Sequence, residues 1–355
     1  MNQLRTRPLT VACLQINAHW GTDVLSTIRH ADSLLTPFWQ PPTGPCSSTN
    51  RIPSSGKKPD ILVLPELAFT GYGFPSRAAI APYLEPTVRG ITTKWAQRTA
   101  RRIGCHVIVG YPERPEVGNI LKANEEEGEE RKEEEEEGPI YNSAVVVGPC
   151  GTVLYNYRKH FLYEADEKWG ASPGQDGFGC LDLKISGSSS SPAVSGATTA
   201  GQSAQSDKDK EDMQIRVVLG LCMDLNPEKF EAPFTKFEFG NFAVMNRADI
   251  IIMPMAWLAF GHDDDGKEVE DEPDWRTVHY WARRLTPVVS QYAQAGPAKT
   301  SNTIFVASNR CGTEDKTVTY AGSSSVLRFC NDASVQLIAS LPKGSEGVLI
   351  TDVEI

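Results

Sequence analysis

Residues 216–227 read Arg-Val-Val-Leu-Gly-Leu-Cys-Met-Asp-Leu-Asn-Pro. The first part is a short apolar run with paired valines that ends at a turn signal, a pattern typical of a buried strand. Cys222 therefore sits where strand becomes turn, on a rigid element, with its sulfur free to face a cleft. That position suits a nucleophile, although a lone cysteine at a strand end is more often a small core residue.

Two other segments share this design. They are Ile61-Leu-Val-Leu-Pro-Glu66 and Tyr155-Asn-Tyr-Arg-Lys159-His160, and each brings an ionisable side chain to the end of an apolar or aromatic stretch. A carboxylate, an ammonium and a thiol are the groups that acyl transfer through a covalent thioester requires. Taken singly, Glu66 could cap a turn and Lys159 could lie at an exposed hairpin end.

The composition is that of an ordinary soluble globular protein, with 40% hydrophobic and 23% charged residues and a net charge of −10. This charge argues against a broad nucleic-acid or anionic-membrane surface. The eight cysteines include no CxxC pair, which favours reduced thiols and an intracellular, cytoplasmic location. The polar N-terminus predicts no signal peptide, and no apolar run reaches the ~18 residues of a membrane span.

Apolar runs and amphipathic stretches alternate along the chain, which predicts a layered α/β arrangement in a single domain, residues 1–355. Two surface insertions are expected, at about 116–138, rich in glutamate, and at 186–212, rich in serine and glycine. The expected strands are 9–16, 61–64, 106–110, 141–147, 153–157, 216–222, 249–254, 303–308, 324–328 and 347–353. The expected helices are 23–38, 87–103, 236–247 and 274–285.

Five ordered motifs make the chain recognisable. They are Leu64-Pro-Glu66-Leu with Thr70-Gly71-Tyr72, Tyr157-Arg-Lys159-His160, Glu167 with Ser172-Pro-Gly174, Gly220-Leu-Cys222-Met-Asp224, and Asn309-Arg310 with Gly322-Ser-Ser. With these motifs the chain resembles the nitrilase superfamily of carbon–nitrogen hydrolases. Residues 159–167 and 222–234 look like its fungal branch, the protein N-terminal asparagine and glutamine amidohydrolases.

The resemblance implies a four-layer α-β-β-α sandwich of the nitrilase type and a Glu-Lys-Cys triad. Cys222 would be the nucleophile, Glu66 the acid and base, and Lys159 the oxyanion stabiliser together with the backbone N–H that follows Cys222. Glu167 would hold Lys159, and Glu164 is the rival for that role.

An N-terminal amide substrate carries a free α-ammonium, so its pocket should contain a carboxylate. Asp224 is the first candidate, since a two-residue step along a strand returns to the same face as Cys222; it could equally cap the turn. Tyr72 and Trp257 could line the side-chain slot or belong to the core. No cofactor or metal is expected, because His262 and the aspartates after it have no second histidine at ligand spacing.

The implied activity is that of a hydrolase acting on non-peptide carbon–nitrogen bonds. It would convert the side-chain amide of N-terminal Asn or Gln of peptides and proteins to Asp or Glu, release ammonia, and feed an N-degron degradation route. No nucleic-acid or membrane partner is expected, and a monomer is favoured over a homodimer. The alternatives are a small-molecule ω-amidase, carbamoylase or nitrilase with the same mechanism, and a catalytically inactive binding relative.

Overall fold

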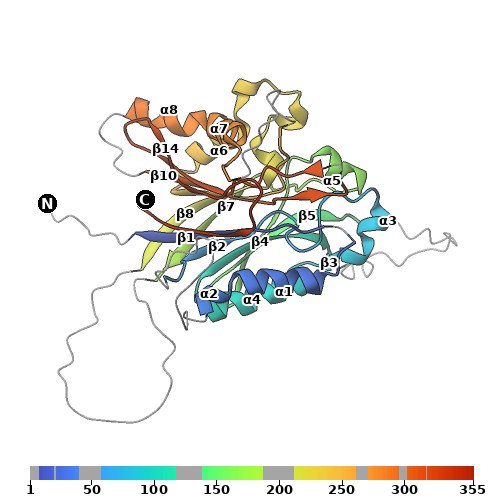
Figure 1. Cartoon of the computed structure of the whole chain (residues 1–355). Coiled ribbons are helices and arrows are strands. Elements are labelled where there is room, and N and C mark those ends of the chain that lie inside the picture. The colour runs from blue at the N-terminus through green and yellow to red at the C-terminus, as the bar shows by residue number, and fades with distance from the viewer. Residues whose placement is uncertain are drawn as a thin grey trace, which may run out of the picture.

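Two β-sheets lie face to face between two layers of helices (Figure 1). This four-layer α-β-β-α sandwich confirms the predicted fold class. The computed structural model describes residues 8–19, 21–39, 57–116, 138–186, 212–260, 271–295, 302–316 and 318–355.

The first sheet has the strand order β15-β1-β2-β4-β5-β6, with the short β3 paired to β4. Strand β1 pairs in parallel with β2 and antiparallel with β15, so the last strand of the chain completes this sheet beside the first. The strands are β1 (Leu9–Gln15), β2 (Ile61–Val63), β3 (Glu85–Pro86), β4 (His106–Arg114), β5 (Tyr141–Val147), β6 (Val153–Arg158) and β15 (Gly347–Val353).

The second sheet has the order β14-β13-β10-β9-β8-β7. Strand β9 pairs in parallel with both β8 and β10, so these three strands end at the same edge of the sheet. The strands are β7 (Gly179–Ile185), β8 (Met213–Leu219), β9 (Ile250–Met255), β10 (Thr303–Asn309), β13 (Ser325–Phe329) and β14 (Val335–Ser340). A separate hairpin joins β11 (Thr313–Glu314) to β12 (Val318–Thr319).

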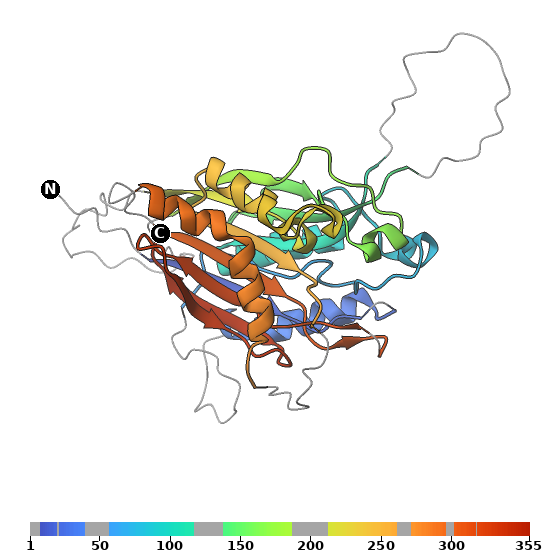
Figure 2. The same cartoon turned by 90° about the horizontal axis from the view of Figure 1, so that it is seen from above.

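Helices cover the outer face of each sheet (Figures 1 and 2). The first sheet carries α1 (Val24–Leu34), α2 (Thr36–Trp39) and α4 (Ile91–Ile103), and the second carries α6 (Glu238–Met245), α7 (Trp275–Arg284) and α8 (Thr286–Ala295). Shorter helices are α3 (Arg77–Ile80), α5 (Glu164–Lys168), η1 (Ala81–Tyr83), η2 (Cys222–Leu225), η3 (Glu228–Phe230) and η4 (Phe234–Lys236). Across the described ranges, no helix has the length and apolar character needed to cross a membrane.

Side chains of each central strand alternate between two apolar layers. In β1, Val11 and Cys13 pack between the two sheets, whereas Ala12 and Leu14 pack under α1 and α4. A third layer lies between the second sheet and its helices. This alternation follows from the two-residue period of a strand. Because both faces of the central strands are apolar, the polar side chains of interest lie beyond the strand ends.

Most predicted elements have the predicted type, and the differences have local causes. The helix expected over 87–103 begins at Ile91, because Gly90 is its N-cap and Glu85–Pro86 pair with β4. The helix expected over 23–38 is interrupted at Leu35, where Pro37 fits the first turn of a new helix. Strand β8 ends at Leu219, and Cys222 opens the 3₁₀ turn η2.

Strands β7 and β14 and helix α8 were not predicted. The two insertions lie almost entirely outside the described residues, as do His262 and the aspartates that follow it.

Candidate active site

The Glu66 carboxylate lies just beyond β2, in a turn that its neighbours hold in place. Arg310 donates from Nη1 to the carbonyl oxygens of Glu66, at 3.2 Å, and of Leu67, at 2.7 Å. A Cβ on Gly110 would lie 2.7 Å from the Glu66 Cα, so this close approach of β4 requires glycine. The second sheet contributes the backbone N–H of Ala256, which donates to Glu66 Oε2 at 2.9 Å. The fully buried carboxylate is therefore fixed between the ends of the two sheets.

Lys159 follows β6 and is also fully buried. Its Nζ lies 2.6 Å from Glu66 Oε1 and 2.6 Å from Asp166 Oδ2. Burial by itself would lower the pKa of Lys159, but the carboxylates of Asp166 and Glu66 raise it above its usual value. Lys159 is thus held as an ammonium although its side chain is fully buried.

Cys222 is presented by a strained turn at the end of the second sheet. Its backbone is left-handed, with φ of 39°, a conformation that non-glycine residues rarely adopt outside functional sites. Two residues earlier, a Cβ on Gly220 would lie 2.7 Å from both Met253 and the Phe239 ring. Only glycine allows this close packing, which places the turn and its sulfur against the core of the second sheet.

The three groups are electrostatically coupled. Burial raises the pKa of the Cys222 thiol well above its usual value, the Glu66 carboxylate raises it further, and the Lys159 ammonium lowers it. Burial likewise raises the pKa of Glu66, against the lowering effect of Lys159. A protonated thiol beside a carboxylate of raised pKa forms an acid–base pair in which the proton can move to Glu66 when a substrate is attacked.

The carboxylate that holds Lys159 differs from both predicted residues. Asp166 contacts Nζ, whereas Glu167 and Glu164 are exposed. The helix α5 explains this choice: Asp166 is its third residue, and its carboxylate also accepts from the N-cap N–H of Tyr163 at 2.9 Å. The sequence carries no recognisable capping signal here, because the N-cap residue is Tyr163 and not Ser, Thr, Asp or Asn.

Asn142 of β5 is a second residue that the sequence did not single out. Its Nδ2 donates to Glu66 Oε1 at 2.7 Å and to Asp166 Oδ1 at 2.8 Å. The side chain is fully buried. The amide thus bridges the two carboxylates that flank Lys159 and fixes their separation.

Asp224 has a place different from the predicted ammonium site. It is fully buried, and its carboxylate accepts from the backbone N–H groups of Leu221 (2.7 Å), Phe161 (2.7 Å) and His160 (3.2 Å) and from the Tyr157 hydroxyl (2.7 Å). Protein donors occupy both oxygens, which leaves no face for a substrate. Asp224 instead ties the Cys222 turn to the segment that follows Lys159.

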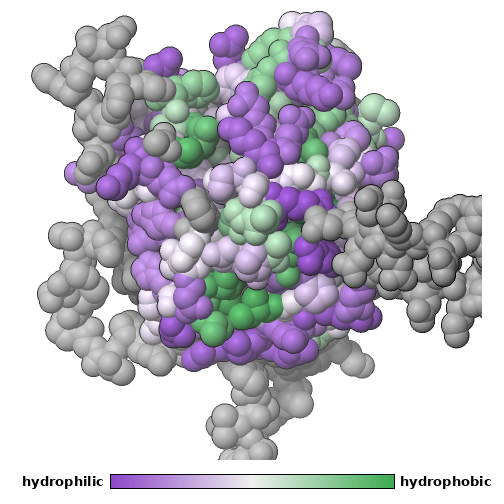
Figure 3. All heavy atoms as spheres, turned by 90° about the vertical axis from the view of Figure 1, so that its right-hand side faces the viewer, coloured by the Kyte–Doolittle hydropathy of each residue, from purple (hydrophilic) through white to green (hydrophobic). Residues whose placement is uncertain are grey.

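Tyr72 connects the triad to a cavity of about 360 Å³. Its hydroxyl lies 3.4 Å from Lys159 Nζ and donates to Asp166 Oδ2 at 3.2 Å. Tyr163 borders the same cavity, and the acidic residues along it are Glu164, Glu314 and Asp315. The face on which α3 and α5 lie is mainly hydrophilic, with one hydrophobic patch in its lower part and smaller ones above it (Figure 3).

Trp257 lies beside the triad but does not border this cavity. It is 7% exposed and belongs to the apolar cluster that contains Cys222, and its ring packs 5.5 Å from that of Tyr280. Of the two residues predicted to line the slot for the substrate side chain, Tyr72 lines this cavity and Trp257 does not.

Among the described residues, no group of three or more His, Cys, Asp and Glu side chains is arranged to hold a metal ion.

Comparison with known proteins gives the family to which the chain is similar. Residues 10–186 match the model of the carbon-nitrogen hydrolase family. The protein N-terminal amidase of Saccharomyces cerevisiae is 26% identical to this chain over an alignment that covers 84% of this chain and 87% of that protein. The chain belongs to the carbon–nitrogen hydrolase family.

Solved structures support the same placement within the carbon–nitrogen hydrolases. Structures of an N-terminal amidase with a Gln-Val peptide and with an Asn-Glu peptide each align with a TM-score of 0.73 and 25% identity. Each alignment covers 98% of both chains. The similarity therefore extends over the whole sandwich, including the ends of the strands where Glu66, Lys159 and Cys222 meet.

Proposed function

We propose that this carbon–nitrogen hydrolase removes the side-chain amide of N-terminal asparagine and glutamine from peptides and proteins. The observation that carries the proposal is the buried contact of Glu66 with Lys159 beside Cys222, next to a cavity that Tyr72 lines. A relative named as a protein N-terminal amidase, and two structures of an N-terminal amidase with a Gln and an Asn peptide, supply the substrate class. The products would be an N-terminal aspartate or glutamate, which can enter an N-degron route, and ammonia.

The reaction begins with transfer of the Cys222 proton to Glu66. The thiolate attacks the carboxamide carbon and forms a tetrahedral oxyanion, which the Lys159 ammonium and the backbone N–H of Met223 stabilise. Glu66 then gives its proton to the amide nitrogen, and ammonia leaves as the C–N bond breaks. A thioester between the substrate and Cys222 remains.

Hydrolysis of the thioester uses the same carboxylate. Glu66 takes a proton from a water molecule, the resulting hydroxide attacks the thioester carbon, and the C–S bond breaks with return of the proton to sulfur. Lys159 stays protonated throughout, since two carboxylates hold its pKa above the usual value. Asp166 and Asn142 act as positioning residues, because they contact Lys159 and Glu66.

The substrate ammonium would lie in the cavity rather than at Asp224. Glu164 and Asp315 border that space, and Glu314 adds its charge there while its carboxylate accepts from Tyr72, Gly73 and Tyr320. Among the described residues that line the cavity, Lys168 is the one basic side chain. An N-terminal ammonium would therefore be drawn toward the cavity by its charge. A blocked N-terminus lacks this attraction.

The test compares ammonia release from three substrates: the peptide Asn-Gly-Gly, its N-acetylated form and free asparagine. We expect release from the free-amine peptide alone, and loss of that release in the Cys222→Ala variant, which should keep the wild-type melting temperature. Turnover of free asparagine or of the acetylated peptide at the same rate would instead indicate a small-molecule amidase. Absence of turnover with a thiol that iodoacetamide does not modify would indicate an inactive binding relative.

A further inference from the structure

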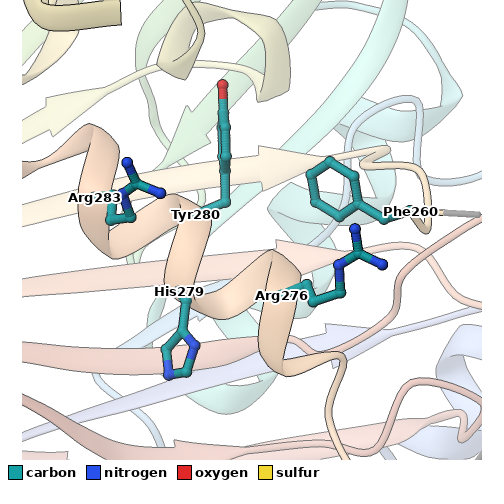
Figure 4. Close-up of a pocket in the computed structure, with 5 residues that line it drawn as sticks. All are labelled: Phe260, Arg276, His279, Tyr280 and Arg283. Carbon is teal, nitrogen blue, oxygen red and sulfur yellow. The ribbon is translucent and has the colours of Figure 1, made fainter. Parts of the chain in front are cut away.

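The tyrosine hydroxyl groups that bind residues around the triad differ in how tightly they are held. Those of Tyr157 and of Tyr280, which is directed away from helix α7 (Figure 4), each donate to a side-chain oxygen at 2.7 Å. The Tyr72 hydroxyl has its acceptor, Asp166 Oδ2, at 3.2 Å. An O–H···O hydrogen bond is usually about 2.7–2.8 Å long, so the Tyr72 hydroxyl is held less tightly than the other two.

The rest of Tyr72 is fixed in place. Its backbone N–H and that of Gly73 donate to the Glu314 carboxylate, at 3.1 and 3.2 Å. Its ring is buried in an apolar cluster that includes Leu67 and Trp169. The hydroxyl is therefore the part of Tyr72 that can change its partner, because the O–H turns about its C–O bond without movement of the ring.

The Lys159 ammonium has three N–H groups, and two of them are committed to carboxylates. Glu66 Oε1 and Asp166 Oδ2 each lie 2.6 Å from Lys159 Nζ. The third N–H faces the Tyr72 hydroxyl oxygen at 3.4 Å, a distance longer than that of most hydrogen bonds. An oxyanion that binds to Lys159 must therefore take this third N–H, and in doing so it comes to lie next to the Tyr72 hydroxyl.

The Tyr72 hydroxyl can leave Asp166 at little cost. Asp166 Oδ2 also accepts from Lys159, at 2.6 Å, and from the Tyr163 N–H, at 2.9 Å, so it keeps two partners. Burial raises the pKa of Tyr72 well above its usual value, and neighbouring negative charges, that of Asp166 first, raise it further. The hydroxyl thus stays protonated and remains a hydrogen-bond donor.

We propose that the Tyr72 hydroxyl is a further catalytic group, which donates to the tetrahedral oxyanion together with Lys159 and the backbone N–H of Met223. The inference rests on the proposed function, since it concerns the intermediate formed from the substrate carboxamide. The proton stays on Tyr72 throughout, and the O–H turns back to Asp166 when the C–N bond breaks. Tyr72 also lines the cavity of about 360 Å³, so a substrate in this cavity lies against it. A donor that is fixed in advance stabilises the developing charge without reorganisation.

The experiment compares Tyr72→Phe with the wild type on the peptide Asn-Gly-Gly. The variant keeps the ring and its packing and removes the hydroxyl. We expect kcat to fall by about 100-fold, as for the loss of one oxyanion donor, with KM and the inhibition constant of the product Asp-Gly-Gly unchanged. The loss affects kcat because this hydrogen bond forms in the transition state and not with the bound substrate.

A second measurement separates this role from a purely structural one. Methyl methanethiosulfonate converts a thiolate to a methyl disulfide and releases methanesulfinate, so no tetrahedral carbon with an oxyanion forms. Mass spectrometry of the peptide that contains Cys222 follows the reaction at this residue. Its rate and pH dependence should be the same in Tyr72→Phe and in the wild type. If the rate falls in step with kcat, Tyr72 acts on the thiol through Asp166 and Lys159, and the oxyanion role is wrong.

The matched control is Tyr111→Phe, in β4. Tyr111 is also buried, and its hydroxyl donates to Asn156 Oδ1 at 2.8 Å, a residue that does not contact the triad. This control should lower the melting temperature and keep kcat near that of the wild type. An equal fall of kcat in both variants would show that the loss of any buried hydroxyl disturbs the sandwich, and it would remove the specific role of Tyr72.

Failure of this inference can be told apart from failure of the proposed function. Unchanged kcat in Tyr72→Phe would overturn the role of the hydroxyl and leave the proposed function intact. Wild-type turnover of free asparagine alone would contradict the proposed function. The comparison of Tyr72→Phe with the wild type on free asparagine would then still decide the role of Tyr72, because any carboxamide forms the oxyanion. Absence of turnover with every amide would remove both proposals.

Discussion

Asn142 lies outside the five sequence motifs. Among such residues, it is the one whose loss we expect to reduce catalysis most. It donates to Glu66 and to Asp166, the two carboxylates on either side of Lys159. Asn142→Ala should lower kcat by about 100-fold with little change in KM, because the triad loses its spacing while the cavity is unchanged. Steady-state kinetics with an Asn-Gly-Gly peptide measures this separation of kcat from KM.

The pH dependence of kcat/KM distinguishes a positioning role of Asn142 from a purely structural one. Asn142→Asp places a third carboxyl group beside Glu66, which raises the pKa of Glu66 further because like charges disfavour ionisation. Since Glu66 must be ionised to accept the thiol proton, the acid limb of kcat/KM should move to higher pH. Ser143→Ala is the matched control: its hydroxyl binds Glu113 from the next position of β5, so its acid limb should not move. An unmoved limb in Asn142→Asp would contradict the positioning role.

The structure brings together Glu66, Lys159 and Cys222, as the motifs predicted, and surrounds them with supporting residues that the motifs did not indicate. Lys159 directly follows β6, and Glu66 and Cys222 each follow a strand, β2 and β8, after two intervening residues, so strand patterns and motif order suffice to find them. The choice of Asp166 over Glu167 depends on the phase of the short helix α5, which two adjacent acidic residues do not reveal. The position of Asp224 was predicted from the alternation of side chains along a strand, which would put Asp224 and Cys222 on one face. Strand β8 ends before Cys222, so this alternation does not apply there.

At the level of elements, helix α4 begins at a buried acid. Glu85 accepts from the Thr92 N–H at 2.9 Å and from the Thr92 hydroxyl at 2.5 Å, and Gly90 leaves room for its side chain. Burial raises the pKa of Glu85 to about 7, against the lowering effect of these hydrogen bonds. The neutral form is therefore favoured in the folded protein over most of the acidic range.

This raised pKa predicts a pH-dependent contribution to stability. A carboxyl group whose pKa is higher in the folded than in the unfolded state stabilises the folded protein. For Glu85 this contribution is fully present below the pKa of the unfolded state, about 4.5, and is lost as the pH rises to about 7. The loss should amount to about 3 kcal/mol. Glu85→Gln cannot ionise, so its free energy of unfolding should fall less than that of the wild type between pH 4.5 and 7.5.

Urea unfolding at several pH values measures this difference. Glu231→Gln, which replaces an exposed glutamate, is the control and should follow the wild-type pH dependence. Parallel curves for the wild type and Glu85→Gln would show that Glu85 ionises normally in the folded protein.

Element boundaries were predictable where a local signal marks them and not elsewhere. The hairpin of β5 and β6 has its predicted strands because Gly148 to Gly151 form a compact turn between two apolar runs. Strand β14 was not predicted because its apolar run, Leu337-Ile-Ala339, is short, and all its side chains are exposed or half-exposed. Helix α8 follows α7 after a single residue, so no loop sequence between the two helices indicates where α8 begins.

At the scale of the whole molecule, the catalytic edge and the two residues that flank the insertion at 186–212 lie at opposite ends of the second sheet. Ile185 of β7 pairs with Met213 of β8, so the chain leaves and re-enters the sheet at directly opposed residues. Cys222 lies beyond the other end of β8, and the six steps from Met213 to Leu219 span about 20 Å. The two residues from which the insertion leaves and re-enters the sheet are thus remote from the triad along the strand.

Replacing residues 186–212 with the two-residue turn Asn-Gly should keep the fold and the activity. Ile185 and Met213 are already opposed, and Asn-Gly favours the turn that joins antiparallel strands in this way. Closing a much shorter loop costs less entropy, so we expect the free energy of unfolding to rise by about 1–2 kcal/mol. The control replaces the same residues with a glycine–serine chain of equal length, which should match the wild type. A lower melting temperature of the shortened protein, or a fall in kcat/KM for Asn-Gly-Gly, would show that the insertion contributes contacts to the fold or to the site.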